Sequence, residues 1–421
     1  MKKYGCIGKK LTHSFSKEIH ARLADYAYDL IELSEEEVPP FLERKDFQAI
    51  NVTIPYKQTV IPYLDSVSDI ARRIGAVNTV VNRDGTLCGY NTDYYGMMAL
   101  IRHAGLCLTD KKVLVLGTGG TSRTARVVAH DMGASEILTV SRSKTDKTDK
   151  TEENISYEEA VTLHADAQII INTTPVGMYP DCDAKPIDIS AFDHLEGVID
   201  AVYNPLSTNL VLDARERGIR SEGGLYMLVM QAVVAVEKFL DTEIDRDMAD
   251  RTFAEILAAK ENIVLTGMPG SGKSTVGKRI YMDGYEFIDT DAEVEKACGC
   301  TIKELIAAKG EEFFRNLEAE VIRDVSSRSG RIISTGGGAV LRAENVRALK
   351  RNGKLFFLDA KLSRLRATSD RPLSDTEDKL VKLYHERLGI YKATADVTVP
   401  DLGEADAEAE YILAKRMESI L

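Results

Sequence analysis

Short apolar runs recur along the chain, and each is bounded by glycine or by polar residues. Runs of this length are typical of buried strands, and stretches with helical spacing lie between them. The clearest strand candidates are Tyr4 to Ile7, Val113 to Leu116, Glu136 to Val140, Gln168 to Ile171, Gly197 to Ile199 and Ile263 to Leu265. Strands that alternate with helices predict an α/β fold with βαβ units and parallel sheets.

Residues 241–261 are predicted to form a helix, because Met248, Phe253, Ile256 and Leu257 recur at helical spacing in a polar segment. We interpret this helix as the end of a first unit, since a second strand–glycine–helix pattern follows it. The chain has 421 residues, too many for one compact core, and two or three domains are expected. The charged, low-complexity segment 143–154 is predicted to be a solvated loop.

The composition of the chain bears on whether it binds nucleic acid, whether it spans a membrane and which cellular compartment it occupies. A net charge of −12 argues against nucleic acid as the main partner, because a phosphate backbone needs a basic surface. No apolar run approaches the ~18 residues of a membrane span, and no apolar signal region precedes the first strand. The six cysteines lack a zinc-binding spacing and are expected to be reduced thiols. A cytoplasmic protein is the expectation.

Two glycine-rich loops follow predicted strands and precede helical segments. The first runs from Gly117 to Gly120, and the second is Gly267-Met268-Pro269-Gly270-Ser271-Gly272-Lys273-Ser274. Backbone amides at such a turn bind phosphate, because the helix N-terminus favours negative charge. The second loop has the complete G-x-x-x-x-G-K-S pattern, in which the lysine reaches the outer phosphates of a nucleotide and the serine ligates Mg²⁺. With no guanine-binding Asn-Lys-x-Asp motif after the loop, the second part of the chain is predicted to be a small-metabolite kinase.

The residues that follow Val140 favour NADP(H) over NAD(H) in the first site. An NAD enzyme normally carries Asp or Glu there for the ribose 2′-hydroxyl, whereas this chain has Ser141 and Arg142. An arginine can bind a 2′-phosphate, although a surface arginine without a ligand is the alternative.

Several motifs in residues 4–260 resemble those of shikimate dehydrogenases. They are Ser14-Phe15-Ser16, Asn51 to Lys57 (NVTIPYK), Gly75 to Thr79, Gly89 to Asp93, Asn172 to Met178, Asp200 to Pro205 and Gly224 to Gln231. The resemblance implies that Lys57 and Asp93 share proton transfer at the substrate carbonyl, which agrees with the need of ketone reduction for a proton donor. It further implies substrate contacts from Ser14, Ser16, Asn51, Thr53, Asn78, Tyr203 and Gln231. The expected NADP(H) contacts are Gly117, Gly119, Gly120, Thr121, Ser122, Ser141, Arg142, Thr173, Val202 and Gly224.

Residues 262–400 resemble shikimate kinases. The matching motifs are Phe287 to Asp291 (FIDTD), Glu311 to Glu318 (EEFFRNLE), Gly336-Gly337-Gly338, Arg371-Pro372-Leu373, and Arg387 four residues before Tyr391. The resemblance implies catalytic roles for Asp291, Lys273 and the lid residue Arg371, and a magnesium site at Ser274 and Asp289. Shikimate would contact Asp291, Arg315, Gly336, Gly337, Gly338 and Arg387. ATP would contact Gly267, Gly270, Ser271, Gly272, Lys273, Ser274, Thr275, Arg364 and Arg371. The alternative for Arg315 is an ordinary helix ion pair with Glu311 or Glu318.

Together these resemblances imply a bifunctional enzyme of aromatic biosynthesis. It would reduce 3-dehydroshikimate with NADPH and then phosphorylate shikimate with ATP and Mg²⁺. The expected domains are a substrate domain (1–97 and 230–260), a Rossmann-like NADP-binding domain (98–229) and a P-loop kinase domain with a parallel sheet (261–421). Two alternatives stay open: a quinate/shikimate dehydrogenase fused to another small-molecule kinase, and a nucleotide-sensing regulator. The sequence leaves the oligomeric state undetermined.

Overall fold

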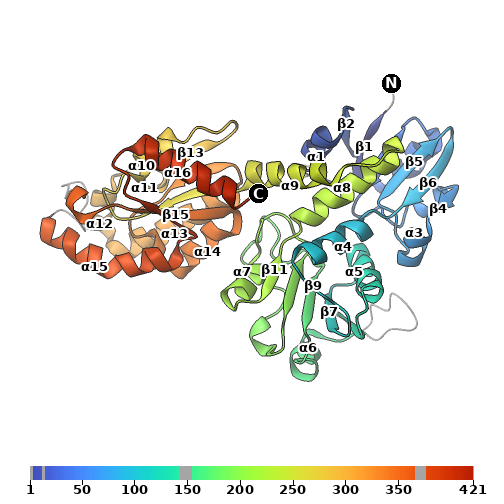
Figure 1. The fold of residues 1–421 in the computed structure, drawn as a ribbon, viewed down its shortest axis with the longest axis horizontal. Helices are drawn as coiled ribbons and strands as arrows, with labels where there is room; N and C mark the ends of the chain where they lie inside the picture. The colour runs from blue at the N-terminus through green and yellow to red at the C-terminus, as the bar shows by residue number, and fades with distance from the viewer. Residues whose placement is uncertain (1–2, 12–14, 143–153, 366–375, 421) are drawn as a thin grey trace. The chain divides into compact units, whose positions relative to one another are not determined.

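The computed structural model describes residues 3–11, 15–142, 154–365 and 376–420, and the chain divides into two compact units, Met1–Ile256 and Leu257–Leu421. Figure 1 labels helices and strands of each unit. All six predicted strands are present, and the α/β class with parallel sheets is confirmed. The predictions for Ser14, for Arg371 and for the loop at 143–153 lie outside the described residues. In the described ranges, no helix is both long enough and apolar enough to cross a membrane.

The first unit starts with a six-stranded mixed sheet in the order β2-β1-β3-β5-β6-β4. Its strands are β1 (Tyr4–Gly8), β2 (Tyr28–Glu32), β3 (Ala49–Val52), β4 (Ser66–Val67), β5 (Thr79–Arg83) and β6 (Thr86–Tyr90). Strand β1 pairs in parallel with β2 and β3, whereas β5 runs antiparallel to β3 and β6. The helices in this part are α1 (Ser16–Leu23), α2 (Val38–Arg44) and α3 (Asp69–Ile74), with short 3-10 turns η1 (Glu35–Glu37) and η2 (Ile61–Tyr63).

A second sheet in the same unit has five parallel strands in the order β11-β10-β9-β7-β8. They are β7 (Lys112–Leu116), β8 (Glu136–Val140), β9 (Ile169–Asn172), β10 (Gly197–Asp200) and β11 (Arg220–Glu222), and they alternate with α5 (Gly120–Asp131), α6 (Tyr157–Leu163), η3 (Ile189–Ala191) and α7 (Asn209–Glu216). The chain builds outward from β7 first to β8 and then, on the other side, to β9. Ligands of open α/β sheets bind at such a switch point, beyond the carboxyl ends of the strands.

Two long helices, α4 (Asp93–His103) and α8 (Leu225–Leu240), lie side by side in the first unit (Figure 1). The contact is close because Gly96 faces α8: a Cβ atom there would lie 2.6 Å from the backbone oxygen of Met227. Apolar residues of both helices, including Met97 and Met227, belong to one buried cluster. The pair therefore fixes Asp93, the first residue of α4, relative to Gln231 of α8.

The helix predicted at 241–261 is shorter than expected, and of its four predicted apolar residues Met248 is exposed, whereas Ile256 is buried and Phe253 and Leu257 are partly buried. Helix α9 covers Arg246–Lys260 and spans the boundary between the units. Met248 is 43% exposed, whereas Ala249, Thr252 and Ile256 are buried. Met248 is therefore not part of the buried surface of α9. The buried residues of this helix are mainly small side chains, together with Ile256.

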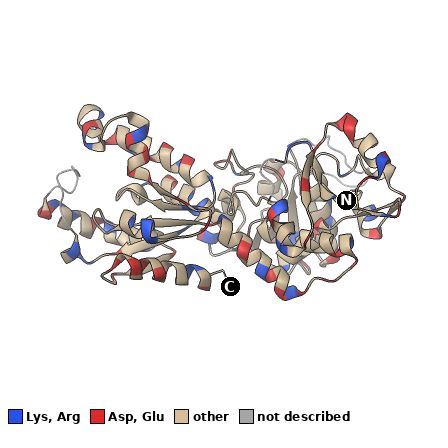
Figure 2. Cartoon of the chain, turned by 90° about the horizontal axis from the view of Figure 1, so that it is seen from above, with Lys and Arg blue, Asp and Glu red and all other residues tan. Residues whose placement is uncertain are grey.

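The second unit has one parallel five-stranded sheet in the order β13-β14-β12-β15-β16. The strands are β12 (Asn262–Thr266), β13 (Glu286–Asp289), β14 (Arg331–Ser334), β15 (Gly353–Asp359) and β16 (Val397–Pro400). The helices are α10 (Lys273–Arg279), α11 (Thr290–Cys298), α12 (Ile302–Lys309), α13 (Glu311–Ser327), α14 (Ala343–Asn352), α15 (Glu377–Thr394) and α16 (Ala405–Glu418), with η4 (Ala339–Leu341) and η5 (Leu362–Arg364). Acidic and basic segments alternate along helices of both units (Figure 2).

Arg416 connects the last helix of the second unit to its beginning. Its side chain is 1% exposed, and its guanidinium donates to the backbone oxygens of Ala258 and Glu261 and to the Tyr285 hydroxyl. It also lies 3.5 Å from the carboxylate of Glu261, whose pKa is raised by burial and lowered in part by this arginine. A cation at this place satisfies carbonyls that the end of α9 leaves without intrahelical partners.

All six cysteines are free thiols, as predicted. Cys298 and Cys300 have their sulfur atoms 3.5 Å apart, and the neighbouring Cys298 thiol raises the pKa of Cys300.

Candidate active sites

Lys57 and Asp93, the predicted proton-transfer pair, are in direct contact. The Lys57 Nζ lies 2.6 Å from Asp93 Oδ2, and the two side chains are only 15% and 10% exposed. Lys57 lies in the turn after β3, where its backbone oxygen accepts a hydrogen bond from Val77. Asp93 begins α4, and the dipole of the helix favours a carboxylate at that end.

A buried network of hydrogen bonds links three of the predicted substrate residues, Asn51, Asn78 and Gln231. Asn51 Nδ2 donates to Thr79 Oγ1 (3.1 Å), and Asn78 Nδ2 donates to Thr92 Oγ1 (3.0 Å). The two threonine hydroxyls lie 3.2 Å apart, and the Thr92 hydroxyl also reaches Gln231 Oε1 at 3.4 Å. Thr79 and Thr92 lie inside motifs quoted above, but sequence reasoning assigned neither of them a role.

The network continues to a buried histidine. Tyr28 donates to Asn51 Oδ1 at 2.7 Å, and the ring of His20 stacks on Tyr28 with centroids 3.9 Å apart. His20 is 0% exposed, and burial lowers its pKa to about 3, against a smaller opposing effect of Asn51. His20 is thus neutral in the folded protein at ordinary pH.

We predict that His20 makes the first unit less stable in mild acid. Unfolded His20 binds a proton near pH 6.5, whereas the folded residue stays neutral until about pH 3. Stability is therefore complete above pH 6.5 and is lost as pH falls below it, by about 2 kcal/mol from this residue between pH 6.5 and 5. The measurement is the opening free energy of β1 amides by hydrogen exchange in the wild type and in His20→Gln. The stability difference between them should shrink by this amount, and a difference that is independent of pH would contradict the assignment.

Ser16, Thr53 and Tyr203 are the remaining predicted substrate residues of the first unit that the structure describes. Tyr203 follows β10 and packs edge-on against Phe15, with ring centroids 5.3 Å apart, and Phe15 directly precedes Ser16 at the start of α1. Burial raises the pKa of the Tyr203 phenol. Thr53 donates its backbone N–H to the oxygen of Ile7 at 3.0 Å. The ring contact brings Tyr203, which follows a strand of the second sheet, next to the start of α1.

The first glycine loop is next to Lys57 and can accept phosphate groups. A Cβ atom on Gly120, the first residue of α5, would lie 3.8 Å from Lys57 Cδ, whereas a Cβ on Gly119 would meet no atom within 4 Å. Gly117 adopts a φ of 105°, which few other residues tolerate. The Ser122 hydroxyl is buried and has no hydrogen-bond partner among the described residues. A dinucleotide phosphate would satisfy this hydroxyl and the helix N-terminus, so the residues fit the cofactor.

Arg142 is exposed at the end of β8, as a residue that meets a 2′-phosphate must be. It lies close enough to Tyr157 to oppose the burial that raises the pKa of that phenol. The preceding residue, Ser141, is buried and bonds through its backbone N–H to Ile155.

A buried carboxylate, not singled out from the sequence, holds the other predicted NADP(H) residues. Asp200 Oδ1 accepts from Asn172 Nδ2 (2.9 Å) and from the N–H of Val202 (3.0 Å), and Oδ2 accepts from Thr208 Oγ1 (2.7 Å). Complete burial raises the pKa of Asp200 to about 6. The oxygen of Val202 in turn accepts from the N–H of Gly224 at 2.8 Å. Asp200 therefore positions the loops that follow β9 and β10. Thr173, which directly follows β9, donates its hydroxyl hydrogen to the backbone oxygen of Leu116 at 2.6 Å.

In the second unit, the loop Gly267–Ser274 has the form required for a nucleotide phosphate. Gly272 precedes α10 with a φ of 90°, and Lys273 Nζ lies 2.9 Å from the backbone oxygens of both Gly267 and Met268. The Ser271 hydroxyl is buried without a hydrogen-bond partner among the described residues. The loop therefore fits a triphosphate, and its backbone oxygens hold the ammonium group of Lys273. Gly270 and Thr275 flank these residues in the same turn and helix.

The predicted magnesium residues are brought together. Ser274 Oγ donates to Asp289 Oδ2 at 2.6 Å, across the ends of α10 and β13. Mg²⁺ usually takes one or two protein oxygens and completes its shell with water and phosphate, and this pair fits that donor set.

Two of the three glycines after β14, Gly336 and Gly338, pack directly against the predicted shikimate residues, whereas Gly337 packs against Pro269. A Cβ on Gly336 would lie 2.5 Å from Asp291 Oδ1 and 2.7 Å from Glu318 Oε1, and a Cβ on Gly338 would overlap the guanidinium of Arg315. Arg315 pairs with Glu318 at 2.8 Å and with Glu311 at 3.3 Å, so the helix ion pairs of the alternative interpretation exist as well. Glu318 is 1% exposed, and its Oε1 has no hydrogen-bond partner among the described residues.

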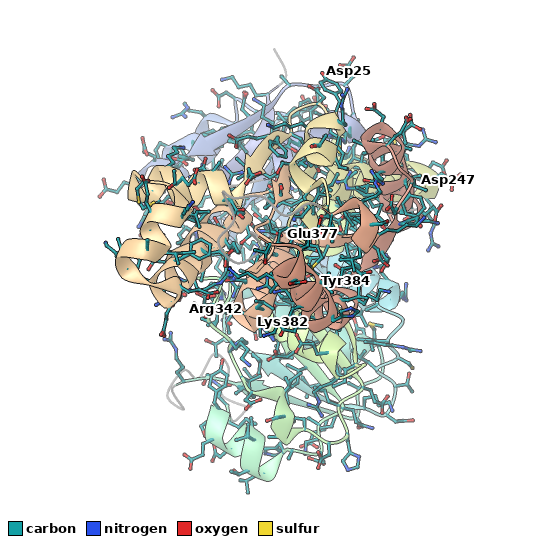
Figure 3. The ribbon with its side chains drawn as sticks, turned by 90° about the vertical axis from the view of Figure 1, so that its left-hand side faces the viewer. Asp25, Asp247, Arg342, Glu377, Lys382 and Tyr384 are labelled. Carbon is teal, nitrogen blue, oxygen red and sulfur yellow. The ribbon has the colours of Figure 1, made fainter. Side chains whose placement is uncertain are left out.

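Arg387 of α15 approaches the same glycine loop. Its Nη1 donates to the oxygen of Gly337 at 3.1 Å, and the Tyr391 hydroxyl donates to the same oxygen. Arg342, labelled in Figure 3, joins the end of η4 to α13 through a 2.8 Å bond to Asn316. Arg364, predicted to contact ATP, bonds to Asp401 and Gly403 in the loop after β16.

Gly338→Ala should weaken shikimate binding in the kinase reaction without removing a charge. Gly338 has φ −104° and ψ −3°, which alanine accepts, so the only cost is the overlap of the new methyl group with Arg315. We expect the shikimate KM to rise about tenfold or more, as for loss of a charge-assisted hydrogen bond. Gly389→Ala in α15 is the matched control, because a Cβ there meets nothing within 4 Å. Equal kinetics of both variants would contradict the placement of Arg315 beside this loop.

The first unit thus has the fold and site of a nicotinamide-dependent reductase, and the second has those of a P-loop kinase of small molecules. The shikimate dehydrogenase substrate-binding domain family matches residues 6–80, and the shikimate kinase family matches residues 269–417. A shikimate dehydrogenase (NADP(+)) of Clostridium beijerinckii is 37% identical over 265 residues, which are 60% of this chain and 97% of that protein.

Solved structures agree over the same region. Shikimate dehydrogenase 1 of Peptoclostridium difficile is 36% identical with a TM-score of 0.57, covering 61% of this chain and 98% of that one. Shikimate 5-dehydrogenase of Thermus thermophilus, solved with NADP(H) and shikimate, is 28% identical with a TM-score of 0.55, covering 61% and 99%. The chain belongs to the shikimate dehydrogenase family in its first unit and carries a shikimate kinase domain in its second, with NADP and ATP as their nucleotides.

Proposed function

We propose that the two activities act in sequence: the first unit reduces 3-dehydroshikimate to shikimate, and the second phosphorylates shikimate. The proposal is supported by the shared metabolite, because the product of ketone reduction carries the hydroxyl that the kinase needs. It is carried above all by the 2.6 Å contact of Lys57 with Asp93, a proton donor and its partner beside the cofactor loop. The expected domains, 1–97 with 230–260, 98–229 and 261–421, are part of this proposal.

In the reductase, Lys57 would donate a proton to the carbonyl oxygen, and Asp93 would orient that ammonium group through the 2.6 Å contact. NADPH supplies the hydride when bound. Asn51, Thr53, Asn78 and Gln231 would hold the ring hydroxyls, while Ser14 and Ser16 would bind the carboxylate. Arg142 would bind the 2′-phosphate of the cofactor.

In the kinase, Asp291 would accept the proton of the attacking hydroxyl. Arg315 and Arg387 would bind the shikimate carboxylate beside the glycine loop, and Lys273 and Arg371 would stabilise negative charge on the phosphate oxygens. ATP supplies the phosphoryl group when bound, and Ser274 and Asp289 would hold its Mg²⁺.

We further propose a cytoplasmic location, which is supported by the six free thiols, since reducing compartments keep cysteines in this form.

One coupled assay tests the sequence of reactions. The full chain receives 3-dehydroshikimate, NADPH, ATP and Mg²⁺, and the expected product is shikimate 3-phosphate with equal consumption of both nucleotides. A parallel assay with quinate and NADP⁺ tests the alternative substrate. If quinate is oxidised faster than shikimate, or if shikimate accumulates without phosphorylation, the proposal is wrong.

A further inference from the structure

The hydrogen bonds of Asn51 use both N–H groups of its side-chain amide. Its Nδ2 carries two hydrogens, and both have acceptors: Thr79 Oγ1 at 3.1 Å and the backbone oxygen of Asn78 at 3.4 Å. Its Oδ1 has two lone pairs and accepts a bond from Tyr28 at 2.7 Å, and the Asn51 side chain also interacts with His20, whose pKa it raises in part. Toward a ligand, Asn51 can therefore act only as an acceptor through Oδ1.

Tyr28 is a fixed donor in this arrangement. It begins β2 and is 3% exposed, and burial raises the pKa of its phenol well above the ordinary value. A hydroxyl that stays protonated always has a hydrogen for Asn51. Because β1 lies between β2 and β3, the Tyr28 side chain must reach across Cys6, the register partner of Asn51.

His20 holds the ring of Tyr28 in place. The two rings stack at 13° between planes, and His20 Nδ1 contacts the Tyr26 hydroxyl at 2.6 Å. His20 belongs to α1, the helix that starts at the predicted substrate residue Ser16. The stack therefore connects two parts of the predicted substrate site through apolar and neutral polar contacts.

We propose that Tyr28 is a positioning residue of the dehydrogenase site: it fixes the amide of Asn51 so that Oδ1 faces the substrate and accepts a hydrogen bond from a ring hydroxyl. Without the phenol, only the two bonds of Nδ2, at 3.1 and 3.4 Å, hold the amide, so Oδ1 is less firmly placed for a ring hydroxyl. The inference rests on the proposed role of Asn51 in substrate binding, and Tyr28 acts through that residue alone.

The test is a double-mutant cycle on the full chain. Tyr28→Phe should lower kcat/KM for shikimate oxidation about tenfold, mainly through KM, as for loss of one buried hydrogen bond. Asn51→Ala should lower it at least as much, and adding Tyr28→Phe to Asn51→Ala should change nothing further. The NADP⁺ KM should stay constant throughout. Tyr4→Phe is the control, because it removes a hydroxyl from the same buried cluster without removing a hydrogen bond that the structure shows for His20, Tyr28 or Asn51, and it should stay within about twofold of wild type.

Each result has a separate meaning. If Tyr28→Phe has the same effect in the presence and absence of the Asn51 side chain, or if Tyr4→Phe is equally harmful, Tyr28 has only a structural role and the inference is overturned. If Asn51→Ala itself leaves shikimate kinetics unchanged, the proposed role of Asn51 fails first, and the positioning role fails with it.

Discussion

Lys57→Met is expected to lower kcat/KM for 3-dehydroshikimate reduction by about 10²–10⁴, the usual contribution of a positioned acid or base. The variant removes the proton donor that contacts Asp93 at 2.6 Å and leaves the carboxylate at the N-terminus of α4, where the helix still favours its charge. NADPH consumption under steady-state conditions measures the loss.

Kinase turnover of the same preparation serves as the control. Lys57 belongs to the first unit, and the kinase residues all belong to the second. We expect normal phosphorylation of shikimate by Lys57→Met, and the same pattern for Asp93→Asn. A folded variant in which both activities fall equally would contradict two independent sites.

Asp291→Asn is expected to lower the kinase turnover number by about 10²–10⁴ at saturating Mg²⁺ and shikimate. Asparagine fills the same space beside Gly336 but cannot accept the proton of the attacking hydroxyl. The turnover number at saturation, rather than KM, is the quantity to compare, because the residue would act in the transition state.

Asp289→Asn is the matched control, two residues away in the same motif. Asp289 contacts Ser274 at 2.6 Å, so its replacement should raise the Mg²⁺ concentration required for half-maximal rate. Additional Mg²⁺ should restore much of the activity of Asp289→Asn and none of that of Asp291→Asn. If Mg²⁺ restores Asp291→Asn instead, the roles of the two carboxylates are reversed.

The sequence predicted strands well where the signal was contiguous. The strand predicted at Glu136 to Val140 has the same bounds in the structure, and the motif around Asn51 and Lys57 occupies one strand and the turn after it. Such motifs carry chemistry in neighbouring residues, so they are visible without a fold.

Residues that act through distant contacts were missed. Thr92 meets Gln231 across 139 positions, and Tyr28 meets Asn51 only because β2 lies next to β1 in the sheet. No local pattern encodes these pairings. The start of the helix predicted at 241 was also wrong, since Asp241 takes a left-handed conformation that ends α8, and four further residues precede α9 before Arg246. A polar segment contains no apolar spacing that would reveal this interruption.

The contact of Arg416 with the end of α9 has a consequence for the order in which the protein folds during translation. Its partner carbonyl at Ala258 is synthesised 158 residues earlier. At a typical elongation rate this interval lasts roughly 8–30 s, during which the nascent kinase lacks the cation that its first segment requires. The polypeptide of the dehydrogenase unit, by contrast, is complete at Ile256. A ribosome paused just before Arg416 should thus carry a finished reductase and an unfinished kinase.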